Sequence, residues 1–453
     1  MLLALLLAAE SALQPFLRLD AKVVALEHVA VIDGTGAPPR EDQTLVIANG
    51  KIAAGPAPAG AVRLDLRGHS VFPGLVGMHD HLFYPAGGGI FHEMARSFPR
   101  LYLAAGVTTI HTGGSLEPYT DIELKKEIDS GKQPGPRIFI TGPYLEGEGS
   151  FAVQMHALRG ADDARQTVNF WADQGATSYK AYNFLTRAEL GAAIDAAHKR
   201  GLKVTAHLCS IGFTEAAQLG IDNLEHGLLV NTEFFSGKKP DQCPPPKDAV
   251  EELSHMAAGD PRLAALIAEL VKRRVAITST LAVFDAFTEP GFRKALSPAV
   301  LDALSTETRA RLLANHLGGP NPALWSGLVK LEMQFERAFA QAGGMLLAGA
   351  DPTGNGAVLA GYGDQRSVEL LVDAGFTPLE ALRIASWNGA VWLGAQDRIG
   401  SIAPGKDADL VVVKGDPSKS ISDMEKVELV FKQGVAYDPA RLAESVRNTV
   451  GLR

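Results

Sequence analysis

The sequence predicts an α/β protein: a (β/α)8 TIM barrel carrying a small β-sandwich domain that is formed from both chain ends. Its 453 residues, 46% of them hydrophobic, can bury a large core but exceed what one compact domain usually holds. Through the middle of the chain, short apolar strands alternate with helical stretches, as in a parallel sheet built from βα units. Both ends instead show short strands with hairpin turns, at Asn49-Gly50 and Gln433-Gly434. The predicted units are a tail at 1–20, the β domain at 21–72 plus 400–445, and the barrel at 73–399.

Eight strands are expected in the barrel, which is the number that closes it. They are residues 71–78, 107–112, 137–141, 177–181, 203–206, 223–225, 275–280 and 345–349. A helix is expected over 187–200, because Leu190, Ala193, Ile194 and Ala197 recur at helical spacing. The connections 231–261 and 284–321 exceed simple βα loops, so we expect them either to cover a substrate or to form an oligomer contact.

Composition excludes some classes of function. The net charge is −8 and no Lys/Arg-rich run is present, so a nucleic-acid partner is not expected. Cys209 and Cys243 are too few for a disulfide framework and are expected to be free thiols. The apolar residues 1–9 resemble the core of a secretory signal without its basic leader, or form an apolar tail or helix. The protein would be periplasmic or secreted in the first case and cytoplasmic in the second, and no run is long enough for a membrane span.

A metal site is predicted from residues that fall at the carboxyl ends of the barrel strands. They are His79, His81, Lys180, His207, His226 and Asp351. These ends share one face of a barrel, so residues far apart in sequence converge there. In an extended strand His79 and His81 point to the same side while Asp80 points elsewhere. Imidazole and carboxylate ligands together favour zinc or a similar metal.

Lys180 needs a separate explanation, because an ammonium ~4 Å from a dication is repelled by on the order of 8 kcal/mol at an effective dielectric of about 20. A desolvated lysine near positive charge loses its proton. The neutral amine can then add carbon dioxide, giving a carbamate that bridges two metal ions. The alternative is a protonated Lys180 paired with a carboxylate such as Asp351, over a mononuclear or empty site.

Several segments carry a resemblance to a known family. They are residues 71–81, 179–182, 206–207, 224–227, 348–351, 385–390 and 400–410, which together span nearly the whole chain. In order and content they resemble the motifs of the amidohydrolase superfamily, and within it the prolidase and imidazolonepropionase-like branch. That branch includes lysine-carbamate enzymes with two metal ions that cleave dipeptides and N-acyl amino acids.

The resemblance implies a division of labour among these residues. It places His79, His81 and Asp351 on one metal ion, His207 and His226 on a second, and the carboxylated Lys180 and a hydroxide between them. Both ions are expected to be zinc. Asp351 would take the proton of the nucleophile and pass it to the leaving amine. His156 is the candidate for stabilising the oxyanion, or else an ordinary loop histidine. His111 would support the site from behind or be a polar barrel residue.

The substrate expected from the resemblance is an amide of an apolar or aromatic amino acid, including dipeptides and ochratoxin A. Related dipeptidases often hold the substrate carboxylate with a tyrosine and an arginine after the fifth-strand histidine, but 208–213 contain neither. Tyr182, Arg159 or the Lys238-Lys239 pair would then replace them, or no carboxylate is needed. Aromatic side chains that would line a pocket are Phe151, Phe184, Phe213, Phe234 and Phe235. The alternatives are a hydrolase that opens cyclic amides or imidazolones and a catalytically silent binding barrel, and a homo-oligomer is expected.

Overall fold

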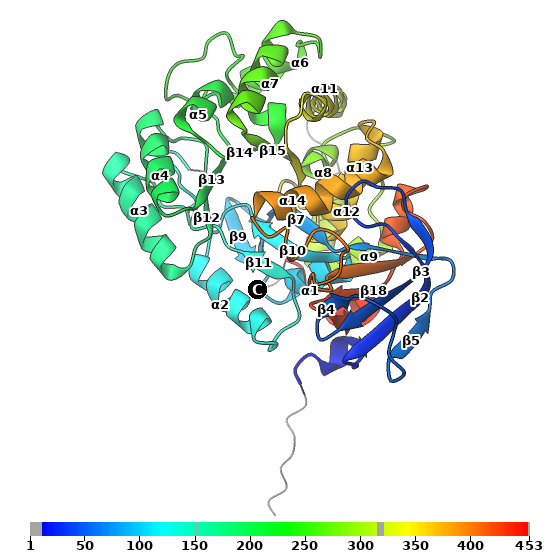
Figure 1. Ribbon diagram of the computed structural model, residues 1–453. Helices are drawn as coiled ribbons and strands as arrows, with labels where there is room; N and C mark the ends of the chain where they lie inside the picture. Colours follow the sequence, from blue (N-terminus) through cyan, green and yellow to red (C-terminus); the bar gives the residue numbers. More distant parts are fainter. Residues whose placement is uncertain (1–10, 151, 315–320, 452–453) are drawn as a thin grey trace, which may run out of the picture.

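The computed structural model describes residues 11–150, 152–314 and 321–451. The signal or tail expected at the extreme N-terminus falls on 1–10, outside the described residues. Within them the chain adopts a mixed α/β fold of the TIM-barrel type (Figure 1). The predicted fold class is therefore confirmed at this level.

Eight parallel strands form the barrel layer in two hydrogen-bonded groups. The first group is β11 (Arg137–Phe139), β10 (Val107–Thr112) and β7 (Leu75–Asp80). The second is β12 (Ser178–Ala181), β13 (Lys203–Ala206), β14 (Asn223–Glu225), β15 (Ala276–Ser279) and β16 (Leu346–Ala348). Between the groups, Thr141 forms one parallel bridge to Ser178, and the Asp351 amide donates to the His79 carbonyl at 2.8 Å. Complete closure of the ladder stays a prediction.

Helices follow most of these strands, and the longer ones, such as α3 (Ala161–Gln174) and α4 (Arg187–Lys199), lie outside them (Figure 1). They are α1 (Ser97–Ala104), α2 (Pro118–Asp129), α3 (Ala161–Gln174), α4 (Arg187–Lys199), α5 (Phe213–Leu219), α6 (Pro246–Ser254), α7 (Pro261–Arg273), α8 (Leu281–Asp285), α9 (Pro298–Ala303), α10 (Thr306–Ala314), α11 (Pro322–Gln341), α12 (Tyr362–Asp373), α13 (Pro378–Arg383) and α14 (Gly389–Trp392). Helix α4 begins with a capping box in which the Thr186 hydroxyl accepts from the Glu189 amide and the Glu189 carboxylate accepts from the Thr186 amide. Its predicted apolar face is buried.

The prediction that residues 71–78 form one barrel strand is wrong. The segment divides at Gly74 into β6 (His69–Pro73), which pairs with β17 (Leu410–Lys414) in the other sheet, and β7 in the barrel. Gly74 donates its amide to the Asp409 carbonyl at 2.8 Å, and a β-carbon there would lie 2.0 Å from Thr108 Oγ1. Only glycine fits this close approach between the two sheets.

The two chain ends build one nine-stranded sheet, in which blue N-terminal strands lie beside orange-red C-terminal ones (Figure 1). Its strands are β1 (Leu17–Leu19), β2 (Val23–Val31), β3 (Arg40–Ala48), β4 (Lys51–Ala53), β5 (Val62–Asp65), β6, β17 (Leu410–Lys414), β18 (Val427–Lys432) and β19 (Val435–Tyr437). The segment predicted to be a tail up to residue 20 instead contributes β1, which pairs with β19. A separate two-stranded hairpin, β8 (Phe83–Gly87) with β9 (Ile90–Glu93), follows β7.

A buried ion-pair cluster joins this sheet to the barrel. Arg137, at the start of β11, donates to Asp407 at 2.8 Å and to Asp409 at 2.7 Å. Asp407 also accepts from Lys51 at 2.6 Å and Arg398 at 2.9 Å. The paired charges satisfy one another where the two layers meet.

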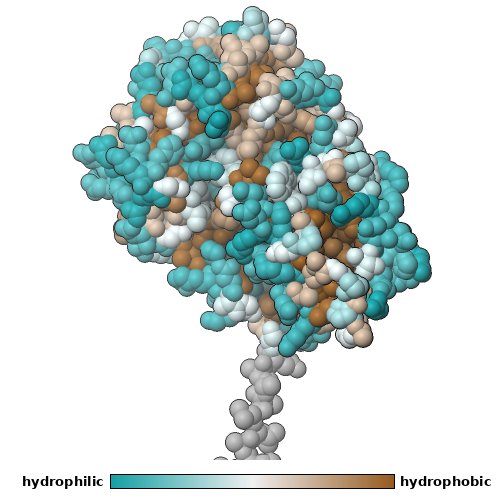
Figure 2. Space-filling view, viewed as in Figure 1, coloured by the Kyte–Doolittle hydropathy of each residue, from teal (hydrophilic) through white to brown (hydrophobic). Residues whose placement is uncertain are grey.

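On the face shown in Figure 2, apolar side chains form separate patches that are surrounded by hydrophilic ones. Among the described helices, none combines the length and the apolar character needed to cross a lipid bilayer.

Candidate metal centre

Three of the predicted ligands meet at the carboxyl ends of β7 and β16. His81 Nε2 lies 3.1 Å and His79 Nε2 3.8 Å from Asp351 Oδ1. One possible ligand atom from each residue lies within 4.8 Å of the others, and all three side chains are buried. Asp80, between the two histidines, accepts from the Ala350 amide at 3.4 Å instead. The alternation of an extended strand thus directs both imidazoles to one point.

The backbone is shaped to bring these side chains together. Asp351 (φ 48°) and His226 (φ 66°) both adopt the left-handed conformation, which non-glycine residues rarely adopt outside turns and functional sites. A β-carbon at Gly113 would lie 2.4 Å from His79 Cδ2, and one at Gly349 would lie 2.4 Å from the His79 backbone nitrogen. Side chains at these two positions would therefore displace His79.

Glu225, which the motif reading did not single out, holds His79 from behind. His79 Nδ1 donates to Glu225 Oε2 at 2.8 Å, leaving Nε2 for a cation. The other carboxylate oxygen accepts from Thr205 Oγ1 and, at 3.0 Å, from Asn223 Nδ2. Burial alone would raise the pKa of Glu225, but Lys180 and His79 outweigh it and hold the pKa well below the usual value. Glu225 could have been identified from the sequence because it is a glutamate within a strand expected to be buried, and a buried charge needs partners.

Lys180, near the carboxyl end of β12, makes no hydrogen bond through its side chain among the described residues. Its side chain is 1% exposed, Nζ has no hydrogen-bond partner among the described residues, and its nearest carboxylate oxygen in an ion pair is Glu225 Oε1 at 3.9 Å. Burial lowers the pKa of Lys180 to about 8, against the opposing pull of Glu225 and Asp351. The alternative expected from the sequence, a protonated Lys180 paired with Asp351, is not among the ion pairs of the described residues. The carboxylate that pairs with Lys180 is Glu225.

His207 and His226 complete the set on the adjacent strands. Their ring centroids lie 4.6 Å apart, and that of His226 lies 4.5 Å from that of His79. His226 Nδ1 is 2.7 Å from Thr280 Oγ1 and 3.8 Å from Asp351 Oδ2. Burial lowers the pKa of His81 to about 4 and that of His207 to about 3, and it holds the pKa of His226 well below its usual value. These imidazoles are neutral at pH 7, the state that binds metals.

Asp351 differs from the imidazoles because it stays charged. Burial alone would raise its pKa, but His79, His81 and His226 outweigh that effect and hold the pKa well below the usual value. The Asp351 carboxylate among buried imidazoles, beside a buried Lys180 nitrogen that has no hydrogen-bond partner among the described residues, fits a divalent cation.

A cavity of about 290 Å³ opens over these residues. Its lining is His79, His81, Phe83, Phe91, Leu116, Tyr144, Met155, Tyr182, His207, His226, Val230, Val283, Phe284, Phe287, Asp351, Thr353 and Gly354. Five of the six metal-ligand candidates, all but Lys180, thus form the polar floor of a pocket whose walls are mainly apolar.

The sequence model of the Amidohydrolase family matches residues 355–436. The fold over almost the whole chain is similar to that of bottromycin amidohydrolase, with a TM-score of 0.74 and 20% identity, covering 98% of this chain and 94% of that one. Residues 355–436 thus match the Amidohydrolase family, and over the rest of the chain the likeness is one of fold.

Other proteins of known structure or sequence are also similar to this chain. A candidate prolidase from Bifidobacterium longum has a TM-score of 0.67 at 25% identity, covering 94% of this chain and 99% of that one. A. niger ochratoxinase has a TM-score of 0.65 at 18% identity, covering 95% and 99%. Adenine deaminase of Ligilactobacillus salivarius (strain UCC118) is 40% identical over 92 residues, which is 20% of this chain and 16% of the relative's length.

His156, expected to stabilise the oxyanion, and His111, expected to support the site, are not among the residues that line the cavity. His156 has a 55% exposed side chain, its Nε2 lies 3.1 Å from Asp163, and it does not line the cavity. His111 is buried inside the barrel. Its Nδ1 lies 3.0 Å from the Met78 carbonyl oxygen and its Nε2 lies 2.7 Å from Ser178 Oγ. Both of its ring nitrogens are therefore engaged in joining strands.

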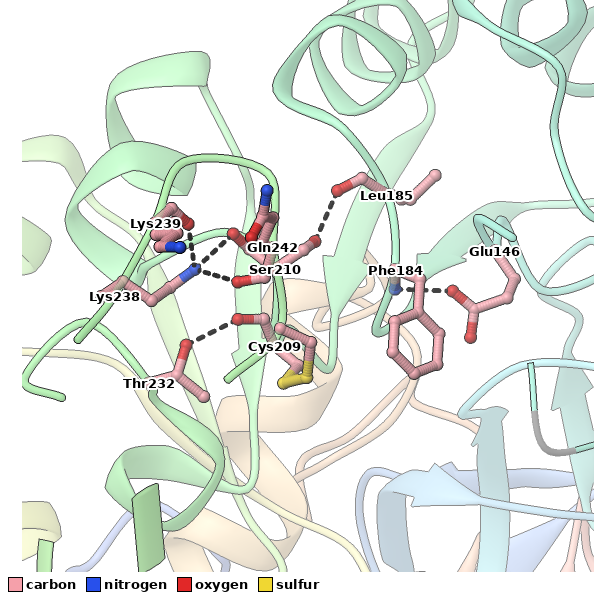
Figure 3. Close-up of a disulfide and its surroundings, with 10 residues drawn as sticks. Glu146, Phe184, Leu185, Cys209, Ser210, Thr232, Lys238, Lys239 and Gln242 are labelled. Atoms are coloured by element: carbon pink, nitrogen blue, oxygen red, sulfur yellow. Dashed lines mark hydrogen bonds between the residues drawn. A yellow bond between two sulfur atoms is a disulfide. The ribbon is translucent and has the colours of Figure 1, made fainter. Parts of the chain in front are cut away.

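Most of the carboxylate-binding candidates also lie elsewhere. Tyr182 lines the cavity, with its ring centroid 4.8 Å from that of His207. Arg159 is exposed and is not part of the lining. The Lys238 ammonium donates to the carbonyls of Ser210, at 2.6 Å, and Gln242, at 2.8 Å, so it stabilises its own loop (Figure 3).

The expectation of two free thiols is wrong. Cys209 and Cys243 form a disulfide with a Cα–Cα distance of 4.9 Å (Figure 3). The long connection after β14 folds back onto the loop after β13, where Thr232 Oγ1 also donates to the Cys209 carbonyl at 2.6 Å. A single disulfide can fasten one loop without forming part of a framework, which is why the cysteine count misled.

The aromatic lining is largely different from the set expected. Phe213 is fully buried in the core, and Phe184, Phe234 and Phe235 are not among the lining residues. Phe151 lies outside the described residues. The aromatic side chains that do line the cavity come from the β8–β9 hairpin, from loops after the barrel strands and, for Phe284, from the short helix α8.

Proposed function

We propose that this protein is a metal-dependent hydrolase that cleaves C–N bonds of amides. The observation that carries the proposal is the meeting of His79, His81 and ionised Asp351 on the floor of the cavity. His207 and His226 beside them supply a second set of nitrogen ligands. The A. niger ochratoxinase and prolidase-like structures support the amide class.

In this proposal two divalent ions, most simply zinc, are held by His79, His81 and Asp351 and by His207 and His226. A carboxylated Lys180 would supply oxygen ligands to both, because its unpaired nitrogen lies among these groups. Such ions provide Lewis-acid chemistry, which polarises a carbonyl and lowers the pKa of water.

The chain's own residues would then move protons and position the substrate. Asp351, ionised and facing the cavity, accepts a proton as water attacks the carbonyl carbon, and returns it to the leaving nitrogen as the C–N bond breaks. His156, the residue expected to stabilise the oxyanion, does not line the cavity. We assign the stabilisation of the oxyanion to Tyr144 instead. Burial raises the pKa of Tyr144 well above its usual value, so its hydroxyl stays protonated and can donate.

The test is a mass-spectrometric survey with zinc-supplemented protein. The panel contains N-acyl amino acids, dipeptides, ochratoxin A, aromatic amides without a carboxylate and ring lactams, and the blank is His207→Ala. Release of an amine or amino acid that the blank does not produce supports amide hydrolysis. A metal-replete protein that leaves the whole panel intact would falsify the proposal.

Ring opening or deamination is the second candidate, favoured by the similarity to an adenine deaminase over 92 residues. Adding adenine to the panel and measuring ammonia separates the two. Ammonia release without amide cleavage would replace amide hydrolysis by this alternative.

A further inference from the structure

The cavity walls form two apolar lobes on opposite halves of the barrel. The first lobe, here the Phe83 lobe, follows the first four strands and consists of Phe83, Phe91, Leu116, Tyr144, Met155 and Tyr182. The second, the Phe284 lobe, follows the sixth and seventh strands and consists of Val230, Val283, Phe284 and Phe287. The ligand candidates lie between them.

Each lobe contacts a different ligand candidate. Phe83 stacks on His81, with ring centroids 4.4 Å apart and planes 26° apart. Phe284 meets His226 edge to face, with centroids 5.8 Å apart. A scissile bond above the metal-ligand residues therefore has an aromatic wall on each side.

The residues of the pocket wall also discriminate among substrates. No lysine or arginine is among the described residues that line the cavity. Aromatic ring faces are themselves electron-rich and do not stabilise an anion. A carboxylate placed in either lobe would lose its water and meet no cationic side chain of the lining, which is unfavourable.

Three cationic side chains outside the cavity lining already donate to backbone carbonyls. Lys238 is bound by backbone carbonyls of its own loop. Arg311 donates to the Ala86 carbonyl at 2.7 Å and holds the β8–β9 hairpin from outside. Arg293 donates to the Thr288 carbonyl at 2.8 Å. Using any of them for a substrate carboxylate would break an existing contact.

We propose that the substrate carries uncharged, apolar or aromatic groups on both sides of the scissile amide, and that a free carboxylate next to the bond is disfavoured. This inference rests on the proposed amide hydrolysis. It separates the chain from enzymes that act on dipeptides or N-acyl amino acids, even though the fold is shared.

The experiment compares two compounds that differ by one carboxylate. N-(2-phenylethyl)benzamide and N-benzoyl-L-phenylalanine are each incubated with the zinc-supplemented full chain, and kcat/KM is measured for benzoate release. We expect the neutral amide to be cleaved at least 10-fold more efficiently. An acid that is cleaved equally well or better would overturn the inference and leave amide hydrolysis standing.

The same experiments distinguish failure of this inference from failure of the proposed amide hydrolysis. If neither compound is cleaved while other amides of the survey are, the two-lobe inference is wrong. If no amide of the survey is cleaved, amide hydrolysis itself fails and the inference fails with it.

A cation placed in a lobe provides the converse test. Phe91→Arg alters the Phe83 lobe and Phe287→Arg alters the Phe284 lobe, and both side chains are only partly buried. One of the two lobes receives the phenylethylamine or phenylalanine part of the substrate. The arginine variant in that lobe should raise the ratio of kcat/KM for N-benzoyl-L-phenylalanine to kcat/KM for N-(2-phenylethyl)benzamide at least 10-fold. The matched variants Phe91→Leu and Phe287→Leu should keep the wild-type ratio. An unchanged ratio in both arginine variants would contradict the assignment.

Discussion

His79 and Glu225 are joined by a 2.8 Å hydrogen bond inside the barrel, although 146 positions separate them in sequence. The carboxylate fixes the imidazole so that Nε2 faces His81 and Asp351. Glu225→Gln should weaken zinc binding by about 10- to 100-fold, because such outer partners orient the ligand and raise its basicity. Competition with a chelator measures this affinity. The exposed Glu251→Gln is the control, and equal affinities for both variants would refute a positioning role.

Carboxylation of Lys180 should depend on pH in a defined direction. The reactive form is the neutral amine, and the pKa of Lys180 is lowered to about 8. At fixed dissolved carbon dioxide, the rate of carbon-dioxide-dependent metal loading should rise about 10-fold per pH unit below 8 and level off above it. Metal content after desalting follows the loading. A rate still rising steeply from pH 9 to 10 would indicate a lysine with an ordinary pKa.

The phenol of Tyr144 should matter for the chemical step. Tyr144→Phe removes one hydrogen-bond donor and keeps the ring, so we expect kcat to fall by about 100-fold while KM changes less than about 3-fold. Tyr119→Phe, at a 56% exposed position, is the control. A change in KM alone would move Tyr144 from transition-state stabilisation to substrate binding.

Much of the fold follows from local pattern. Residues 203–206 and 223–225 form strands with the predicted bounds, and α4 ends one residue before its predicted end. The division at Gly74 was missed because 71–78 is apolar throughout, and only the approach of Thr108 reveals why the strand changes sheets.

Part of the candidate site could also be predicted from the sequence, and part could not. Strand-end positions indicated the six ligand candidates, and the structure brings them to one barrel mouth, with His79, His81 and Asp351 closest. Glu225, the aromatic lobes and the Cys209–Cys243 disulfide depend on contacts between distant loops or across the barrel, which spacing along the chain does not encode.

The disulfide should stabilise the long loop after β14. Closing a loop of 34 residues contributes roughly 3 to 4 kcal/mol in the chain-entropy description. Cys243→Ser should therefore lower Tm by several degrees, and a reducing agent should have the same effect on the wild type only. Cys209→Ser/Cys243→Ser serves as the matched control. A reductant that lowers the Tm of this double variant as well would show that the effect does not arise from this bond.

Glu336 on α11 should make stability depend on pH. It is fully buried next to Glu332, and burial raises its pKa to about 8. The folded state keeps a proton that the unfolded chain has released above about 4.5, so Glu336 makes the free energy of unfolding fall as pH rises from 4.5 to 8. Glu336→Gln removes this dependence. Its stability relative to wild type should rise with pH by up to about 1.4 kcal/mol per unit.

Urea denaturation at pH 5, 6, 7 and 8 measures the difference, with the exposed Glu307→Gln as reference. A constant difference between wild type and Glu336→Gln across this range would show that the glutamate is ionised throughout.

The direct passage of the chain from β6 into β7, with Arg137 clamped by Asp407 and Asp409, leaves no linker between the sheet and the barrel. The two parts should therefore melt in one calorimetric transition. A barrel fragment cut at residues 74 and 400 would expose an unpaired arginine and the bare end of its first strand. Circular permutation, which keeps both layers intact while moving the termini, is consequently a safer route to engineering this scaffold than excision.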